Sequence, residues 1–314
     1  MRLHEEKRLF SDILRATSDK TGIKVEFVEK DYWITLILNR LAGSKFDREA
    51  VFKGGTSLSK GFGLIDRFSE DIDIAIISRD ASTGNEIKNI IRSIEKEITA
   101  DLREVQSEGV TSKGSRFRKS VFEYDSIEAK NNNNKLIVEI NSFANPFPFR
   151  RLGIKCFVSD FLQQTRNEEY IDKYGLDPFE VNVLNKEQTM LEKVVSLIRF
   201  SFDEDYIESL KGKIRHFYDL YFLMNDAECA DFIQSERFKQ QFSRILNHDR
   251  VMFEEPHGWQ VKKVNESPLV KDFEAVWKQL KEKYKTELTA LAYSPIPEEA
   301  MVGKQISALI GLIQ

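Results

Sequence analysis

Residues 52–74 read FKGGTSLSKGFGLIDRFSEDIDI, and this stretch decides the fold. An apolar run, Ala50-Val51-Phe52, leads into it and is typical of a short strand. A glycine pair, a polar helix start and a second strand-like run with Asp71 and Asp73 follow at once. This order predicts a strand, a turn, a helix and a strand packed into one small α/β unit.

The turn is the first candidate for ligand binding. Gly54 and Gly55 interrupt the strand where the chain needs an unusual φ or a close backbone approach. Thr56 or Ser57 is then expected to cap a helix that runs through Lys60. The free N–H groups at such a helix start suit an anion, so a phosphate group is the expected ligand.

The two aspartates are the second candidate. In an extended chain Asp71 and Asp73 project from one face, and Ile72, Ile74 and Ile76 project from the other. Two carboxylates this close repel unless a cation lies between them, and hard oxygen ligands beside phosphate suit Mg²⁺ or Mn²⁺. A glycine pair alone is often only a loop, and an Asp-x-Asp is often a solvated strand edge. Their combination in one short segment favours a metal-bound nucleoside triphosphate (NTP) and nucleotidyl transfer.

The run from Gly54 to Asp73 resembles the signature of the AbiEii/AbiGii toxin nucleotidyltransferases, a branch of the DNA polymerase β-like superfamily. The match is dense over residues 52–77 and patchier to about residue 225. The resemblance implies an α+β fold. Its polymerase β-like nucleotidyltransferase core would be a mixed sheet with flanking helices, followed by a mainly helical C-terminal lobe.

The resemblance also implies roles for particular residues. Asp71 and Asp73 would bind the metal, and superfamily analogy adds a third carboxylate, for which Glu139 in the strand-like run Lys135–Asn141 is the candidate. The superfamily commonly has Asp there, and a lone Glu is also common on an exposed strand face. The expected nucleotide-binding residues are Gly54, Gly55, Thr56, Ser57, Lys60, Arg67 and Ser69.

Two later catalytic residues are implied by the same family, Lys193 and Asp219. Periodicity places Lys193 on the polar side of a helix over residues 186–200, where a solvated lysine would look the same. Its catalytic role would be to neutralise charge on the triphosphate. Asp219 can pair with Arg215 one turn earlier, or it can position Lys193 or contact the nucleotide.

The implied activity is that of a toxin that uses an NTP and Mg²⁺ or Mn²⁺ to nucleotidylate a target. In some members the target is the acceptor end of tRNA, and a cognate antitoxin protein counteracts the effect. Two alternatives stay open: the same core could modify a small molecule or a protein hydroxyl, or it could be a catalytically silent binding module. The intact pair Asp71 and Asp73 argues against the silent module.

Composition limits the possible functions. The chain has 314 residues, 41% of them hydrophobic. Its net charge of −4 argues against nucleic-acid binding over a large part of the surface. Any RNA contact must therefore be local. Two basic clusters could hold phosphates or be ordinary solvated faces: Lys113, Arg116, Arg118 and Lys119, and then Arg150, Arg151 and Lys155.

Several other classes lack support. Cys156 and Cys229 cannot build a disulfide framework, and no cysteine or histidine spacing suggests zinc. The four histidines are scattered and suggest no hydrolase. Neither a signal-peptide core nor a membrane-spanning run is evident, so a cytoplasmic protein without membrane contact is expected.

The predicted organisation has three parts: N-terminal helices over 1–45, the nucleotidyltransferase core over 46–184 and the helical lobe over 185–314. Helices are expected at 3–17, 25–41, 85–100, 186–200 and 301–313. Further strands are expected at 102–108, 116–125 and 135–141.

Overall fold

The computed structural model describes residues 1–69, 71–77, 83–128 and 134–313. The chain divides into two units, each described here by itself. The first comprises Met1–Gly63 and Phe68–Leu184, and the second comprises Leu64–Arg67 and Asn185–Gln314. In the described part of the chain, no helix is both long and apolar enough to cross a membrane.

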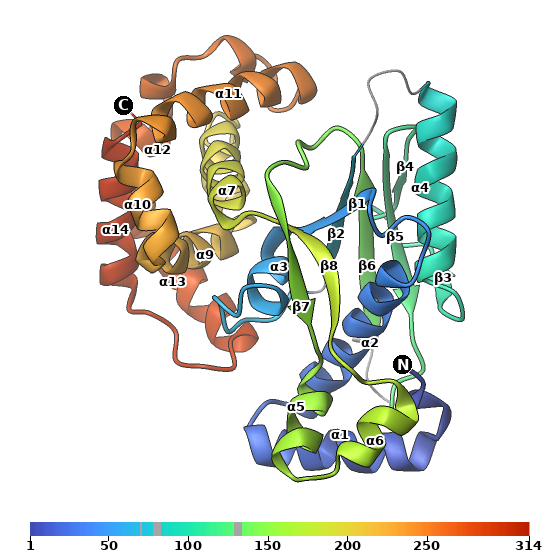
Figure 1. The fold of residues 1–314 in the computed structure, drawn as a ribbon. Helices are drawn as coiled ribbons and strands as arrows, with labels where there is room; N and C mark the ends of the chain where they lie inside the picture. Colours follow the sequence, from blue (N-terminus) through green and yellow to red (C-terminus); the bar gives the residue numbers. More distant parts are fainter. Residues whose placement is uncertain (70, 78–82, 129–133, 314) are drawn as a thin grey trace. The chain divides into compact units, whose positions relative to one another are not determined.

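A mixed sheet forms the centre of the first unit (Figure 1). Among the described residues its strand order is β3-β5-β6-β2-β1-β8-β7, with β4 paired to β5. The β2–β6 and β1–β8 pairs are parallel, and the β1–β2 and β5–β6 pairs are antiparallel. The strands are β1 (Ala50–Lys53), β2 (Asp71–Ile76), β3 (Arg103–Val105), β4 (Ser112–Lys113), β5 (Phe117–Glu123), β6 (Lys135–Asn141), β7 (Phe149–Ile154) and β8 (Phe179–Leu184).

Helix α2 (Val25–Ala42) packs against β8 and against three helices of this unit, α1, α4 and α5. Figure 1 shows α1, α5 and α6 gathered at one end of the sheet. Helix α3 follows β1 directly and packs on β1 and β2. The other helices here are α1 (Lys7–Thr21), preceded by a 3₁₀ turn (Leu3–Glu5), α3 (Gly54–Lys60), α4 (Gly84–Ile98), α5 (Phe157–Gln164) and α6 (Glu168–Tyr174).

Three consecutive charged residues of α2, Glu29, Lys30 and Asp31, are buried. Asp31 accepts hydrogen bonds from the Lys60 ammonium at 2.7 Å and the Phe157 amide at 2.8 Å. Glu29 accepts from the Ser126 hydroxyl at 2.7 Å. Buried carboxylates are tolerated where such donors replace water, so α2 ties several segments of the first unit together.

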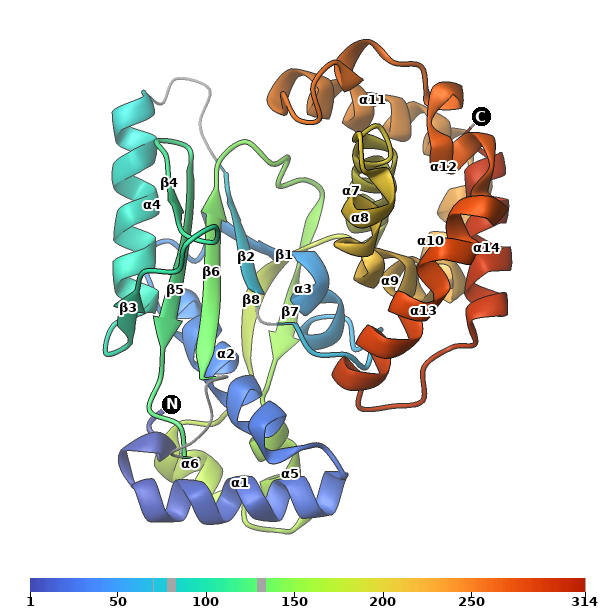
Figure 2. The ribbon, with the colours of Figure 1, turned by 180° about the vertical axis from the view of Figure 1, so that it is seen from behind.

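The second unit is almost entirely helical in its described residues (Figure 2). Helix α9 lies at its centre and packs against α7, α10, α13 and α14. The short segment Leu64–Arg67 joins this unit through an antiparallel bridge between Arg67 and Ala292. Its α-helices are α7 (Lys186–Phe200), α8 (Tyr206–Lys211), α9 (Ile214–Asn225), α10 (Ala227–Gln234), α11 (Glu236–Met252), α12 (Pro268–Lys271), α13 (Phe273–Leu291) and α14 (Glu299–Gly311).

The predicted fold class is confirmed, because helices flank a mixed sheet and a mainly helical region follows. The strand over 135–141 and the helix over 186–200 have the predicted bounds. The predicted strand at 102–108 is shorter, and the first α-helix begins at Lys7 and runs past residue 17 to Thr21. That helix ends where Gly22 takes a left-handed conformation, with φ of 73°.

Candidate functional site

Three acidic side chains share one face of the sheet in the first unit. Asp71 and Asp73 alternate along β2 with Ile72 and Ile74, which are fully buried. Glu139 lies on the neighbouring parallel strand β6, directly beside Asp73 in the register. Register partners project from the same face of a sheet, so the predicted third carboxylate lies next to the predicted pair.

This arrangement is electrostatically strained without a cation. Burial, together with the charges of Glu139 and Asp71, raises the pKa of Asp73 to about 7. The Oδ1 atom of Asp71 is buried and has no hydrogen-bond partner. A bound divalent ion would relieve the repulsion and give that oxygen a partner.

Within the described ranges, no three His, Cys, Asp or Glu side chains already converge as a preformed metal centre. The donor set still fits a hard divalent ion, because all three groups are carboxylates and one oxygen is buried without a partner. Asp71, Asp73 and Glu139 are the residues that would hold Mg²⁺ or Mn²⁺.

Gly54 allows the turn to approach Asp73. Its φ is +80°, a left-handed conformation that side chains disfavour. A Cβ atom at this position would lie only 2.1 Å from Asp73 Oδ2. The close backbone approach expected at the glycine pair therefore serves a carboxylate of this protein.

The predicted helix cap was wrong. Helix α3 already begins at Gly54, and the residue before it is Lys53, so Thr56 and Ser57 lie inside the helix. The Thr56 hydroxyl donates to the carbonyl of Asp71 at 2.5 Å, and the Ser57 hydroxyl donates to the carbonyl of Gly54 at 2.8 Å. The Thr56 hydroxyl therefore ties α3 to β2, whereas the Ser57 hydroxyl bonds within α3.

Lys60 and Ser69, two of the predicted nucleotide-binding residues, are held within the first unit. The Lys60 ammonium lies 2.7 Å from Asp31 Oδ1 and donates to the carbonyl of Lys155 at 2.5 Å. Ser69 is buried just ahead of β2. Lys60 thus neutralises a buried carboxylate of α2, which sequence periodicity does not reveal because the partners are far apart along the chain.

A second cluster of charges lies within the second unit. Asp219 on α9 accepts from Arg67 Nε at 2.7 Å and Arg67 Nη2 at 2.6 Å, and Lys193 Nζ on α7 lies 2.7 Å from its Oδ2. The side chains of Arg67, Lys193 and Asp219 are 3%, 8% and 0% exposed. The structure therefore brings together three of the predicted site residues.

Two expectations about this cluster were wrong. Lys193 does not lie on a solvated helix face, and Asp219 does not pair with Arg215, which instead lies 3.5 Å from Glu287. The possibility that Asp219 positions Lys193 agrees with the 2.7 Å contact. Sequence reasoning missed Arg67 as the partner of Asp219 because 152 residues separate them.

The charges of this cluster shift the pKa values of Asp219 and His216. Burial raises the pKa of Asp219, but Arg67 and Lys193 outweigh burial and hold that pKa well below its usual range. Burial and the nearby ammonium groups of Lys193 and Lys213 lower the pKa of His216, so this imidazole is neutral at pH 7. Its Nδ1 atom is buried without a hydrogen-bond partner. Two cations thus share one carboxylate.

Ion pairs hold much of the predicted basic surface. Lys113 lies 2.6 Å from Glu104, Lys119 lies 3.4 Å from Glu139, and Arg118 pairs with Glu95. In the second predicted cluster, Arg151 lies 2.7 Å from Asp47, and Lys155 pairs with Asp160. These pairs weaken both clusters as phosphate-binding patches, since much of their charge is already neutralised.

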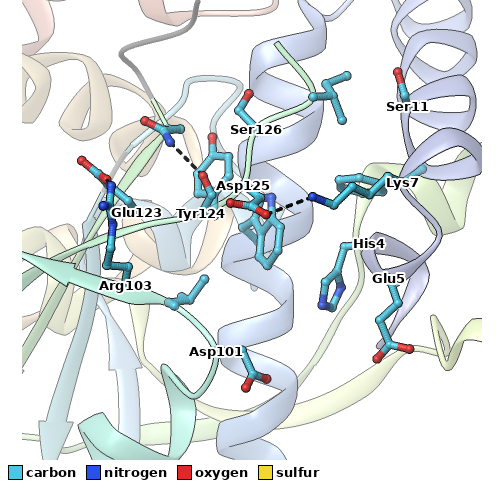
Figure 3. A pocket seen from close by; sticks show the side chains of 15 residues that line it. His4, Glu5, Lys7, Ser11, Asp101, Arg103, Glu123, Tyr124, Asp125 and Ser126 are labelled. Atoms are coloured by element: carbon cyan, nitrogen blue, oxygen red, sulfur yellow. Dashed lines mark hydrogen bonds and ion pairs between the residues drawn. The ribbon is translucent and has the colours of Figure 1, made fainter. Parts of the chain in front are cut away.

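A cavity of about 780 Å³ in the first unit lies apart from these residues (Figure 3). None of the predicted site residues lines it. Figure 3 shows Lys7 paired with Asp125 at its edge, at 3.3 Å. Arg103 and Glu123, also in its lining, pair with each other. The acidic face of β2 and β6 is therefore the better candidate for chemistry.

Comparison with known proteins gives a family. Residues 36–300 match the family model described as nucleotidyl transferase AbiEii toxin, type IV toxin–antitoxin system. No curated protein matches the chain. Among solved structures, the chain is similar to MenT4, a nucleotidyltransferase toxin from Mycobacterium tuberculosis H37Rv, with 14% identity and a TM-score of 0.42 over 96% of this chain and 99% of that one.

The first prediction concerns Gly54. Gly54→Ala should destabilise the protein because the left-handed φ costs about 1–2 kcal/mol and the new methyl group must displace Asp73. Gly63→Ala is the matched control, since Gly63 has φ of +58° but open space around it. Urea unfolding should show the larger loss for Gly54→Ala. Equal losses would mean that the contact with Asp73 has no energetic weight.

The second prediction concerns Asp219. Asp219→Asn removes the negative charge that the buried Arg67 and Lys193 both contact, so the free energy of unfolding should fall by about 3–5 kcal/mol. Because the folded pKa of Asp219 is lowered, its contribution is present above about pH 4 and is lost as the pH falls below that value. The difference in the free energy of unfolding between wild type and variant should therefore become smaller below about pH 4.

Asp226→Asn is the control for Asp219→Asn, because Asp226 pairs with one buried lysine, Lys186, and is itself 17% exposed. Denaturant titrations from pH 3 to pH 7 would make the comparison. A loss no greater than that of Asp226→Asn would contradict the view that Asp219 compensates two buried cations.

Proposed function

The chain belongs to the AbiEii family of nucleotidyl transferase toxins of type IV toxin–antitoxin systems, and from this premise we propose that it transfers a nucleoside monophosphate from an NTP to an RNA acceptor in a metal-dependent reaction. The acceptor that we propose is the 3′ end of tRNA. An RNA hydroxyl attacks the α-phosphorus, a P–O bond forms, and the bond to pyrophosphate breaks while the hydroxyl proton is lost.

The observation that carries the proposal is the row of carboxylates on β2 and β6. Asp71, Asp73 and Glu139 share one sheet face, and Asp71 Oδ1 is buried without a partner. A divalent ion bound there would activate the attacking hydroxyl and neutralise the leaving pyrophosphate. These residues would hold the ion, and the absence of a side chain at Gly54 leaves space for Asp73.

The remaining nucleotide-binding roles are part of the same proposal. We assign triphosphate contacts to the turn formed by Gly54, Gly55, Thr56 and Ser57. In the proposed division of labour, the core over 46–184 supplies the metal ligands and the lobe over 185–314 supplies Lys193 and Asp219. Asp219 would act as a positioning residue, since its carboxylate holds the Lys193 ammonium at 2.7 Å.

Lys193 is the proposed cation for the departing pyrophosphate. Its ammonium lies 2.7 Å from the buried carboxylate of Asp219, which also binds the Arg67 guanidinium. A fixed cation of this kind stabilises negative charge that develops in the transition state without having to reorganise first. Burial of the side chain favours this role over that of an ordinary surface lysine.

The RNA acceptor is supported by the family resemblance more than by the surface of the protein. The net charge is −4, and most cations of the two basic clusters are paired with carboxylates. A small molecule or a protein hydroxyl is therefore the second candidate acceptor. Incubation of the protein with each α-³²P-labelled NTP, Mg²⁺ and cell extract would decide, since label in tRNA supports the proposal and label only in protein or small molecules contradicts it.

The third prediction tests the carboxylates. Asp71→Asn and Asp73→Asn should each lower the rate of nucleotide transfer by about a hundredfold or more, because each removes a charged metal ligand. Neither variant should lower the melting temperature of the metal-free protein, since each removes repulsion. Asp101→Asn, an exposed aspartate paired with Arg40, is the control. If a variant that carries both Asp71→Asn and Asp73→Asn transferred nucleotide at the wild-type rate, these aspartates would not be the metal ligands of the reaction.

The fourth prediction tests Lys193 against a matched lysine on the same helix. Lys186 is 9% exposed and lies 2.6 Å from Asp226, so Lys186→Met and Lys193→Met each remove a buried ion pair of similar geometry. Both should destabilise the protein by about 1–3 kcal/mol. Only Lys193→Met should lower kcat, by about tenfold or more, in single-turnover transfer assays. Equal kcat values would leave Lys193 with a structural role alone.

A further inference from the structure

Four charged side chains stand in one row across four neighbouring strands. Lys53 of β1 is the register partner of Asp73 of β2, Asp73 is the partner of Glu139 of β6, and Glu139 is the partner of Lys119 of β5. Along the row the charges are positive, negative, negative and positive. Register partners in adjacent strands lie about 5 Å apart at their Cβ atoms, so neighbouring charges in the row lie close enough to act on one another.

The two lysines act on the carboxylates between them. Lys119 Nζ lies 3.4 Å from Glu139 Oε2, and both side chains are partly exposed. The charges of Lys53 and Lys119 both offset part of the repulsion that Glu139 and Asp71 exert on Asp73. The row is therefore partly neutralised by the protein itself.

We propose that Lys53 and Lys119 are built-in counter-ions of the acidic row, which neutralise Asp73 and Glu139 in the metal-free protein and compete with the divalent ion for them. This inference rests on the proposed function only in taking Asp73 and Glu139 as metal ligands. It assigns a role to Lys119 that differs from RNA binding at a basic surface patch.

The charges give the physical reason. With Asp71 included, three carboxyl groups lie near two ammonium groups, and the positive charges of Lys53 and Lys119 act against the approach of a further cation. A divalent ion that binds without nucleotide must displace the Lys119 contact to Glu139 and must approach two positive charges. Both effects weaken the affinity for the ion alone, and removal of either lysine should therefore raise that affinity.

The test is the affinity for Mn²⁺ alone, measured without nucleotide by the electron paramagnetic resonance signal of free Mn²⁺. Lys119→Met should bind Mn²⁺ about fivefold more tightly than wild type, the size expected for one partly exposed ion pair. Lys119→Arg keeps the charge and should bind as wild type does. Lys113→Met is the matched control, since Lys113 lies on the same sheet but pairs with Glu104.

Lys53→Met provides an independent variant if Lys119→Met does not fold, as judged by circular dichroism, and should shift the affinity in the same direction. Unchanged or weaker Mn²⁺ binding by the folded variants would overturn the counter-ion role while leaving the metal site intact. A wild-type protein that binds no Mn²⁺ would overturn the metal assignment of the proposed function as well, so the two failures are distinguishable.

Discussion

The parallel pairing of β2 with β6 is the constraint on which the candidate site depends. Its register puts Asp73 beside Glu139, and the alternation along β2 puts Asp71 on the same face. A shift of one residue would turn both aspartates into the core, where Ile72 and Ile74 now lie. The burial of these isoleucines therefore fixes the register, and the register brings the three carboxylates together.

The role of the glycine turn depends on this register, because the turn contacts the aspartates of β2. Gly54 is left-handed and leaves no room for a side chain beside Asp73, while Thr56 hydrogen-bonds the backbone of Asp71. The start of α3 and the start of β2 are therefore coupled, because a movement of one would break contacts with the other. The proposed metal and triphosphate contacts would depend on this coupling, because a functional site needs its groups held in fixed positions.

The two charged clusters differ in their composition. In the first unit, crowded carboxylates are partly neutralised by Lys53 and Lys119. In the second unit, Arg67 and Lys193 both contact the buried carboxylate of Asp219. The chain belongs to the AbiEii family, and the proposed function assigns the acidic group to the metal and Lys193 to the departing pyrophosphate.

The local pattern of the sequence was enough to predict the strand, turn, helix and strand order and the shared face of Asp71 and Asp73. These features follow from periodicity and glycine placement, which act over a few residues. Glu139 and Lys193 came from the resemblance to a family, because a lone acidic residue in a strand and a lone lysine on a helix have no distinctive local pattern.

Only the tertiary structure decided which charges meet. The pairings of Arg67 with Asp219 and of Lys60 with Asp31, and the row that ends in Lys119, each join residues from different elements. Burial then turns these contacts into functional differences, because a charge out of water must find a partner or change its protonation state. The sequence by itself determines which charged side chains the protein has. The packing of helices and strands determines which of these side chains meet and pair.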